Sequence, residues 1–582
     1  MNLNERWGEI IIEELVRHDT ACFCISPGSR STPLALAVAK NYQANSIIFN
    51  DERAAAYYAL GHARGCGRPA VLICTSGTST ANYLPAIVEA SIEQIPMLVL
   101  TSDRPPELRD TGANQSINQT FLFGTHVRWF FDPGCPSPEF KVEALLSTID
   151  HAISKTSRPL PGPVHINLPF REPFFENDDN KRTSKIKNIE KKKPHVKNMK
   201  SSTILSKSEL KELLKNRPKS GILSVGRVPA NSLNSLKILA EELAWPVFAD
   251  ISSGLRLGNN CPNRITYYDQ LLIKDIHSLG WEIDAVWHIG FPPTSKRWLS
   301  HWDKNPAVQM VWIADHSERH DQSHNFDLRI ECGILEFCEQ IIEKLRLEDR
   351  LEELPLKTKQ WLKASAKIEI LMEQHFPLNS EIKDIDDFSI TRRMTEIISK
   401  KHGFFIGNSI PARAVDMIGS GKGADIPIAL NRGASGIDGL IATACGFSSG
   451  INRPVSMLVG DLSAMHDLNS FKLLSLSTEP VFVVLLNNHG GGVFSFLPVA
   501  NKIDIFETFF GTPHSENFLP IAEMFGLNYF RPDSINAFVK DYHKALIENK
   551  SAIIEIFTER SKNPQLLETL ANKIMKCSFE SS

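Results

Sequence analysis

The sequence lacks the features that would place the protein in a membrane, on a nucleic acid or outside the cell. No apolar run reaches the ~18 residues needed to cross a bilayer, and a net charge of −3 gives no support for a nucleic-acid partner. The N-terminus has acidic residues in an amphipathic helical pattern, unlike a signal peptide. The ten cysteines form no CxxC pair and no Cys/His metal spacing, so we expect free thiols, a cytoplasmic location and no membrane span.

A chain of 582 residues is too long for one hydrophobic core, so about three domains are expected. Short apolar runs alternate with helical patterns along most of the chain. This alternation predicts an α/β fold of three doubly wound parallel-sheet domains. The predicted strands are 22–25, 47–49, 70–74 and 97–100, then 222–225, 247–249, 285–289 and 311–314, and finally 403–407, 455–459, 481–486 and 553–557.

Composition shifts divide the chain further. We predict an N-terminal domain over 1–176, a basic linker over 177–214, a middle domain over 215–345, a helical connection over 346–385 and a C-terminal domain over 386–582. The linker has many lysines and few large apolar residues, which is typical of a mobile connection. A nucleic-acid-binding tail is the alternative, but aromatic residues do not interleave the lysines.

Two strand ends in the last domain carry oxygen ligands. The strand over 455–459 ends in Gly460-Asp461, and the strand over 481–486 ends in Asn487-Asn488, with glycines at 490–492. A carboxylate, an amide oxygen and a nearby carbonyl suit Mg²⁺, which completes its octahedron with phosphate oxygens. Ordinary turn residues are the alternative, but two such ends one crossover apart form a more specific signal.

This spacing resembles the thiamine-diphosphate-binding motif of the pyruvate-decarboxylase-like enzymes. The resemblance implies that Asp461, Asn488 and the carbonyl of Gly490 hold Mg²⁺, with Mn²⁺ as the alternative ion, and that the ion holds the cofactor's diphosphate. It also implies that Ile437 is the apolar wedge that bends thiamine diphosphate into a V. The other cofactor contacts it implies are Ser409, Ser463, Ala464, Val493 and Phe494. From the sequence alone, Ser409 is expected to be a helix N-cap, and a helix is expected within 431–446.

Glu52 opens a predicted helix after the second strand. An acid in the first turn of a helix is favoured by the helix dipole, and that reading needs no cofactor. In the family, a glutamate at this place hydrogen-bonds to N1′ of the aminopyrimidine ring, so the resemblance makes Glu52 the catalytic residue. The same resemblance joins the first domain of one subunit to the last domain of another, which implies a homodimer or homotetramer.

Several polar loops follow strands of the first domain. PGSRSTP at 27–33, DER at 51–53, TSGT at 75–78, DRPPEL at 103–108 and GANQ at 112–115 together resemble the 2-succinyl-5-enolpyruvyl-6-hydroxy-3-cyclohexene-1-carboxylate (SEPHCHC) synthase family. This resemblance implies a transferase of menaquinone or phylloquinone biosynthesis. Its reaction is the decarboxylation of 2-oxoglutarate and the addition of the succinic-semialdehyde carbanion equivalent to isochorismate.

Both implied substrates are dianions, which guanidinium groups bind in a fixed orientation. The predicted substrate-binding residues are Ser29, Arg30, Arg104, Gln115, Lys296, Arg297, Arg413 and Arg432. For Arg30, and for the adjacent Lys296 and Arg297, a solvated surface role is the alternative.

Two rival functions remain open on the sequence. One is another carboligase of the superfamily, such as an acetohydroxyacid synthase with FAD in its middle domain; the other is a non-catalytic scaffold with this fold. We expect no dedicated protein base, because histidines near such loops are mostly satisfied locally. The histidines considered are His62, His126, His165, His288, His466 and His489.

Overall fold

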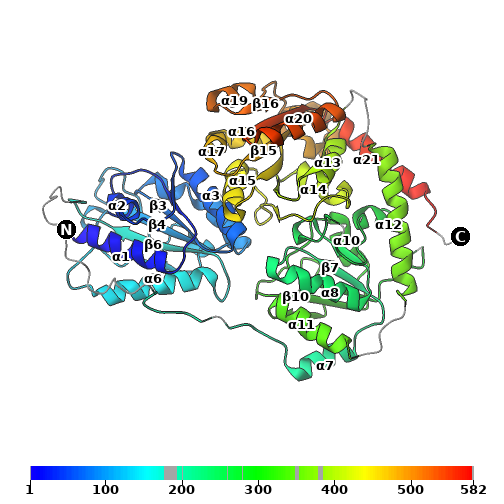
Figure 1. Cartoon of the computed structure of the whole chain (residues 1–582), viewed down its shortest axis with the longest axis horizontal. Helices are drawn as coiled ribbons and strands as arrows, with labels where there is room; N and C mark the ends of the chain where they lie inside the picture. Colours follow the sequence, from blue (N-terminus) through cyan, green and yellow to red (C-terminus); the bar gives the residue numbers. More distant parts are fainter. Residues whose placement is uncertain are drawn as a thin grey trace.

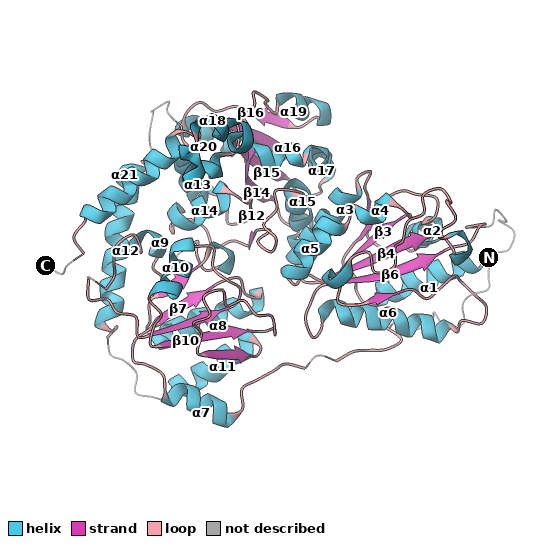
Figure 2. Ribbon diagram, turned by 180° about the vertical axis from the view of Figure 1, so that it is seen from behind, coloured by secondary structure: helices cyan, strands magenta, loops and turns pink. Residues whose placement is uncertain are grey.

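The computed structural model describes residues 2–175, 193–199, 201–258, 260–277, 279–347, 353–377 and 385–579. Three α/β domains follow one another along the chain, as Figure 1 shows in blue, green and yellow to red. Each has a parallel sheet, and Figure 2 shows helices on either side of the sheets. The predicted fold class is therefore confirmed. No helix in these ranges is long and apolar enough to cross a membrane. Residues 177–192 of the predicted linker lie outside the described residues.

The N-terminal sheet has the strand order β2-β1-β3-β4-β6-β5, and all its pairs are parallel. Its central strands are runs of Val, Ile, Leu and Cys that are buried on both faces, as parallel sheets require. The elements are α1 (Leu3–Arg17), β1 (Phe23–Ile25), α2 (Thr32–Lys40), β2 (Ser46–Ile48), α3 (Glu52–Cys66), β3 (Ala70–Cys74), α4 (Thr78–Ala81), α5 (Leu84–Ile92), β4 (Met97–Asp103), β5 (Phe130–Phe131), α6 (Val142–Ser157) and β6 (Pro163–Pro169).

The middle sheet has the order β11-β10-β9-β7-β8. Its elements are α7 (Lys207–Lys215), β7 (Ile222–Val225), α8 (Leu233–Leu243), β8 (Val247–Ala249), α9 (Tyr268–Leu271), β9 (Ala285–Ile289), α10 (Lys296–Lys304), β10 (Gln309–Ala314), β11 (Leu328–Glu331) and α11 (Ile334–Leu345). Helix α7 falls within the predicted linker, and its Leu210 and Leu213 pack into the middle-domain core. Helix α12 (Leu356–His375) then leads to the last domain.

The C-terminal sheet has the order β13-β12-β14-β15-β17-β16. Its elements are α13 (Asp387–Ile397), β12 (Gly403–Ile406), α14 (Ile410–Ile418), β13 (Ile428–Ala429), α15 (Leu440–Ile451), β14 (Val455–Gly460), α16 (Asp461–His466), α17 (Phe471–Leu476), β15 (Val481–Asn487), α18 (Ile503–Phe506), α19 (Leu519–Phe525), β16 (Asn528–Phe530), α20 (Ile535–Glu548), β17 (Ala552–Phe557) and α21 (Lys562–Lys576). Strands β14 and β15 are neighbours, with Gly460 opposite Leu486. The two motif-bearing strand ends therefore lie side by side, as the sequence predicted.

Helices α3 and α15 join the first and last domains through glycines. A Cβ on Gly61 would lie 2.1 Å from the carbonyl oxygen of Thr443, and one on Gly446 would lie 2.0 Å from that of Tyr58. Only glycine allows the two backbones to approach so closely. The prediction of a closely packed helix was right, but the helix begins at Leu440 and residues 431–439 form a loop that ends on Gly439, whose φ is +64°.

Candidate active site

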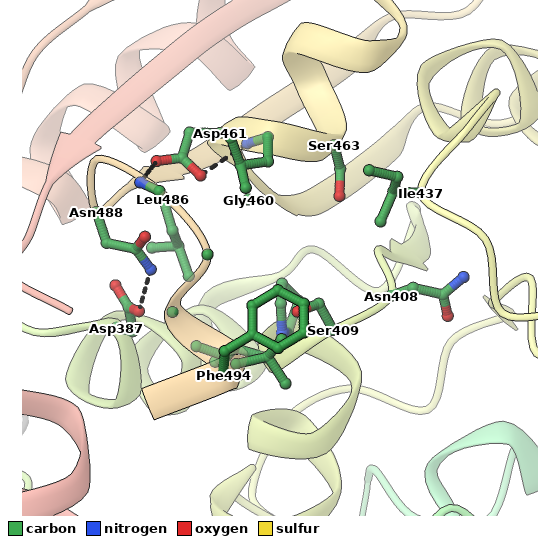
Figure 3. A pocket seen from close by; sticks show the side chains of 17 residues that line it. Asp387, Asn408, Ser409, Ile437, Gly460, Asp461, Ser463, Leu486, Asn488 and Phe494 are labelled. Atoms are coloured by element: carbon green, nitrogen blue, oxygen red, sulfur yellow. Dashed lines mark hydrogen bonds between the residues drawn. The ribbon is translucent and has the colours of Figure 1, made fainter. Parts of the chain in front are cut away.

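A pocket opens at the carboxyl ends of β14 and β15, where α14 and α16 begin (Figure 3). Crevices at this edge of a parallel sheet are the usual ligand sites of such folds. Its volume of about 150 Å³ is far more than one water needs. The lining residues are Asp387, Asn408, Ser409, Ile410, Pro411, Ile437, Gly460, Asp461, Leu462, Ser463, Leu486, Asn488, Gly490, Gly491, Gly492, Val493 and Phe494.

Asp461 is buried at the start of α16 with its carboxylate held in place. Its Oδ2 accepts a hydrogen bond from the backbone N–H of Gly490 at 3.0 Å and lies 3.0 Å from Nε2 of His514. Burial raises the pKa of Asp461 above its ordinary value, because its charge is only partly compensated by these donors. A cation at this carboxylate would relieve that cost.

The amide of Asn488 supplies the second oxygen. Its Nδ2 donates to the carboxylate of Asp387 at 2.9 Å, and its Oδ1 is buried without a hydrogen-bond partner among the described residues. An unpaired buried acceptor costs about 1–3 kcal/mol unless a ligand satisfies it. The third predicted ligand, Gly490, has φ +141°, and a Cβ there would lie 2.2 Å from the carbonyl oxygen of Gly511. These residues fit a hard cation that also binds phosphate.

The other predicted cofactor contacts of the last domain line the same pocket, except for Ala464. Ile437, Ser463, Val493 and Phe494 line it, whereas Ala464 is fully buried in the core behind it and does not.

Ser409 also lines the pocket and is the N-cap residue of α14, as expected, but it does not cap the helix with its side chain. Its side chain makes no capping hydrogen bond, and its φ of +70° is a strained conformation for a residue with a Cβ. Such strain is commonly retained where a backbone approaches a ligand.

Glu52 does not line this pocket in its own chain. Its Oε1 accepts a hydrogen bond from the hydroxyl of Ser79 at 2.6 Å. The neighbouring Arg53 donates to the carbonyl oxygen of His466 at 2.9 Å, and Asp51 accepts from Asn469 at 3.1 Å. The start of α3 therefore contacts His466 at the end of α16 and Asn469 just after it. Neither residue lines the pocket.

The predicted residues of the first domain gather at the carboxyl edge of its own sheet. Arg30 is buried, donates to the carbonyl oxygen of Phe170 at 2.8 Å and contacts Glu172. Burial and the nearby charge of Arg104 lower the pKa of the Arg30 guanidinium. Neither arginine lines the Asp461 pocket.

Two more predicted residues lie at the same edge. The side-chain amide of Gln115 donates to the carbonyl oxygen of Ser76 at 3.1 Å, and the backbone carbonyl oxygen of Gln115 accepts a hydrogen bond from the Ser76 hydroxyl. These two hydrogen bonds join two loops. Ser29 is exposed beside Arg30. Like the arginines, neither residue lines the Asp461 pocket.

A second pair of predicted arginines, Arg413 and Arg432, is not among the residues that line the C-terminal pocket. Arg413, one turn into α14, donates to the carbonyl oxygen of Ser409 at 2.8 Å. Partial burial and the neighbouring Arg432 lower the pKa of the Arg413 guanidinium, so the two cations lie close enough to repel.

Lys296 and Arg297, predicted to contact substrate, begin α10 of the middle domain. Arg297 forms an ion pair with the buried Asp269 and touches Met417 of α14, while Lys296 is exposed. Arg297 is thus already paired, which weakens its candidacy as a substrate ligand.

Sequence reasoning missed two residues that hold the site together. Asp387 binds the amide of Asn488, and His514 lies against Asp461. Asp387 is the last residue of an acidic run that was interpreted as the end of the helical connection. His514 lies in a loop without a recognisable motif.

Two of the histidines considered are buried against hydroxyl groups: His165 lies 2.7 Å from that of Thr101, and His288 lies 2.9 Å from that of Ser224. Burial lowers the pKa of both histidines to about 3.

Comparisons with known proteins agree with this arrangement. The family model described as thiamine pyrophosphate enzyme, N-terminal TPP binding domain, matches residues 5–122; middle domain of thiamine pyrophosphate matches 184–406; and thiamine pyrophosphate enzyme, C-terminal TPP binding domain, matches 430–556. The 2-succinyl-5-enolpyruvyl-6-hydroxy-3-cyclohexene-1-carboxylate synthase of Rubrobacter xylanophilus is 39% identical over 96% of both chains. That of Chlorobium phaeobacteroides is 42% identical over 96% of this chain and 95% of its own.

The chain belongs to the SEPHCHC synthase family. Its enzyme class is therefore that of a transferase, and its cofactor is thiamine diphosphate. A third relative with the same name, from Chlorobaculum tepidum, is 37% identical over 98% of this chain, so the similarity includes all three domains.

Proposed function

We propose that the protein decarboxylates 2-oxoglutarate and adds the remaining four-carbon unit to isochorismate, which releases CO₂ and gives SEPHCHC for menaquinone or phylloquinone synthesis. The observation that carries this proposal is the pocket at β14 and β15, where Asp461, the unpaired Oδ1 of Asn488 and Gly490 converge. The names of the relatives give the product, and the two substrates are those that the family resemblance implies.

In this proposal Asp461, Asn488 and the carbonyl of Gly490 hold Mg²⁺ or Mn²⁺, and the ion binds the diphosphate of the cofactor. Bound thiamine diphosphate supplies the electron sink that lets a 2-oxo acid lose CO₂. Ile437 and Phe494 lie on the pocket wall, where they would confine the organic part of the cofactor. The protein's task is to bind, orient and exclude water around these groups.

Two pairs of arginines would bind the dianionic substrates. Arg413 donates to the carbonyl oxygen of the pocket residue Ser409 and is affected by the charge of Arg432, and Arg30 is affected in the same way by Arg104. Neighbouring guanidinium groups repel each other, so a carboxylate between them is strongly favoured. The other proposed substrate contacts are Ser29, Gln115, Lys296 and Arg297.

Glu52 would hold a proton at N1′ of the aminopyrimidine ring. Because Glu52 does not line the pocket of its own chain, we propose that it serves the pocket of a partner subunit in a homodimer or homotetramer. We also propose a cytoplasmic location, which the ten free cysteines support.

The test is product analysis with purified protein, thiamine diphosphate, Mg²⁺, 2-oxoglutarate and isochorismate. We expect one CO₂ per SEPHCHC formed and no product when either substrate is left out. Acetolactate formation from pyruvate by a protein with bound FAD would instead identify an acetohydroxyacid synthase. Cofactor binding without CO₂ release would identify a non-catalytic scaffold.

A further inference from the structure

The carboxylate of Asp387 gathers three hydrogen-bond donors from separate parts of the last domain. Its Oδ2 accepts from Nδ2 of Asn488 at 2.9 Å and from Nδ2 of Asn563 at 2.7 Å, and its Oδ1 accepts from the hydroxyl of Thr558. Asp387 has no exposed surface. It is the first residue of α13, where the helix dipole favours a negative charge. The buried carboxylate is thus well compensated.

This contact decides which end of the Asn488 side chain faces the pocket. The two ends of an amide are almost the same size, so their orientation is set by hydrogen-bond partners. A carboxylate only accepts hydrogen bonds, so Asp387 binds the NH₂ end and leaves Oδ1 on the other side. Figure 3 shows the nitrogen directed at Asp387 and the oxygen directed away from it. Oδ1 is buried and has no partner in the described part of the chain.

We propose that Asp387 is a positioning residue that keeps the oxygen of Asn488, and not its NH₂ group, turned toward the metal ion. The proposal rests on the cation site of the proposed function. A flipped amide would present N–H donors to a cation, which removes one ligand and adds repulsion. Partners that orient metal ligands in this way typically change metal affinity 10–100-fold when they are mutated.

The experiment measures the affinity of the full-length protein for Mn²⁺ in the presence of thiamine diphosphate, from the electron paramagnetic resonance of free Mn²⁺. In Asp387→Ser, which suits a helix start but is too short to reach Asn488, we expect at least a tenfold loss of affinity. Asp387→Asn should bind within about twofold of wild type, because its carbonyl can replace Oδ2 and its NH₂ can donate to the Thr558 hydroxyl.

A second variant separates orientation from general damage. Asn488→Asp offers an oxygen whichever way the side chain turns, so Asp387→Ser with Asn488→Asp should regain most of the lost affinity. Asp386→Asn is the matched control, because Asp386 caps α13 through Phe388 and Ser389 without touching Asn488. It should bind Mn²⁺ like wild type.

Each outcome decides between specific alternatives. Wild-type affinity in Asp387→Ser, or no recovery in the double variant, would overturn the positioning role. A large loss in Asp387→Asn would mean that the charge of Asp387 acts on the metal directly, and it would overturn the proposal even if the serine variant does not fold. Failure of the wild-type protein itself to bind Mn²⁺ with thiamine diphosphate would instead refute the cation site.

Discussion

Glu89 and Gly433 are 344 positions apart, yet a carboxylate oxygen of Glu89 accepts a hydrogen bond from the backbone N–H of Gly433 at 2.9 Å. The other oxygen accepts from Ala434 at 2.7 Å. An acid of the first domain thus fixes the loop of the last domain that carries Arg432 and Ile437. Burial raises the pKa of Glu89, and these two N–H groups offset part of that effect.

We therefore predict that Glu89→Gln loosens this loop, because an amide has only one acceptor oxygen and leaves one buried N–H unpaired. The cost should be about 1–3 kcal/mol, seen as a lower Tm. If Arg432 binds substrate, the KM for a dianionic substrate should rise more than the dissociation constant of thiamine diphosphate. Glu548→Gln, a surface change on α20, is the control. Equal effects of the two variants would contradict the role of Glu89.

A mixture of two variants tests both the catalytic role of Glu52 and the proposal that Glu52 serves the pocket of a partner subunit. Glu52→Gln should fold normally and lose nearly all turnover, and Asp461→Ala should lose activity through loss of metal and cofactor affinity. If sites are shared between subunits, a co-expressed mixture of the two variants recovers activity, because each mixed pair holds one site with both residues intact. A mixture that stays inactive, although mixed oligomers are isolated, would place Glu52 and Asp461 in one chain's site.

Arg413 and Arg432 should matter for substrates more than for cofactor. Arg413→Ala and Arg432→Ala each remove one guanidinium of the proposed carboxylate-binding pair, so we expect a 10–100-fold lower kcat/KM, which corresponds to about 1.4–2.8 kcal/mol. Calorimetry should show thiamine diphosphate binding within a few-fold of wild type. Arg453→Ala, on an exposed turn after α15, is the control for loss of positive charge. Equal losses in substrate and cofactor affinity would argue against the pair as a carboxylate site.

The sheets and the convergence of Asp461 and Asn488 on one pocket were predictable because both depend on local patterns. Buried parallel strands are short apolar runs, and β14 and β15 each carry their ligand at the carboxyl end, one crossover apart. Five of the strands that the structure describes were not predicted. Strands β5, β13 and β16 have only two or three residues each, most of them only partly buried. Strand β11 has four residues, of which one is buried, and the buried strand β6 is interrupted by the polar residues His165 and Asn167. Such segments leave no apolar run for the sequence to show.

Contacts between distant segments could not be predicted. Asp387 and Asn488 are 101 positions apart, and His514 reaches Asp461 across 53. Nothing local distinguishes Asp387 from the acids before it, since its role comes from where α13 starts relative to β15 and β17. The ion pair between Arg297 and Asp269 also joins separate segments of the chain. The sequence therefore suggested that both basic residues at 296–297 were available to bind substrate, although Arg297 is already paired.

The carboxylate of Asp467 caps the buried start of α15 from outside the helix. One oxygen accepts hydrogen bonds from the backbone N–H groups of Ile441 at 2.9 Å and Ala442 at 3.2 Å, and the other accepts from the Ser470 hydroxyl. Burial raises the pKa of Asp467 to about 6, from the ordinary 3.8, despite these donors. The folded protein therefore binds this proton more tightly than the unfolded chain does.

The sign of the pH effect follows from that shift. Between about pH 4 and pH 6 the folded state holds more protons, so ionisation of Asp467 lowers stability as pH rises, by at most about 3 kcal/mol above pH 6. Asp467→Asn keeps an acceptor for the two N–H groups and removes this ionisation. Its Tm relative to wild type should therefore be higher at pH 7.5 than at pH 4.5, while the exposed Asp504→Asn should show no such change. A relative Tm that stays constant or falls between these two pH values would show that Asp467 is not the buried acid that limits stability.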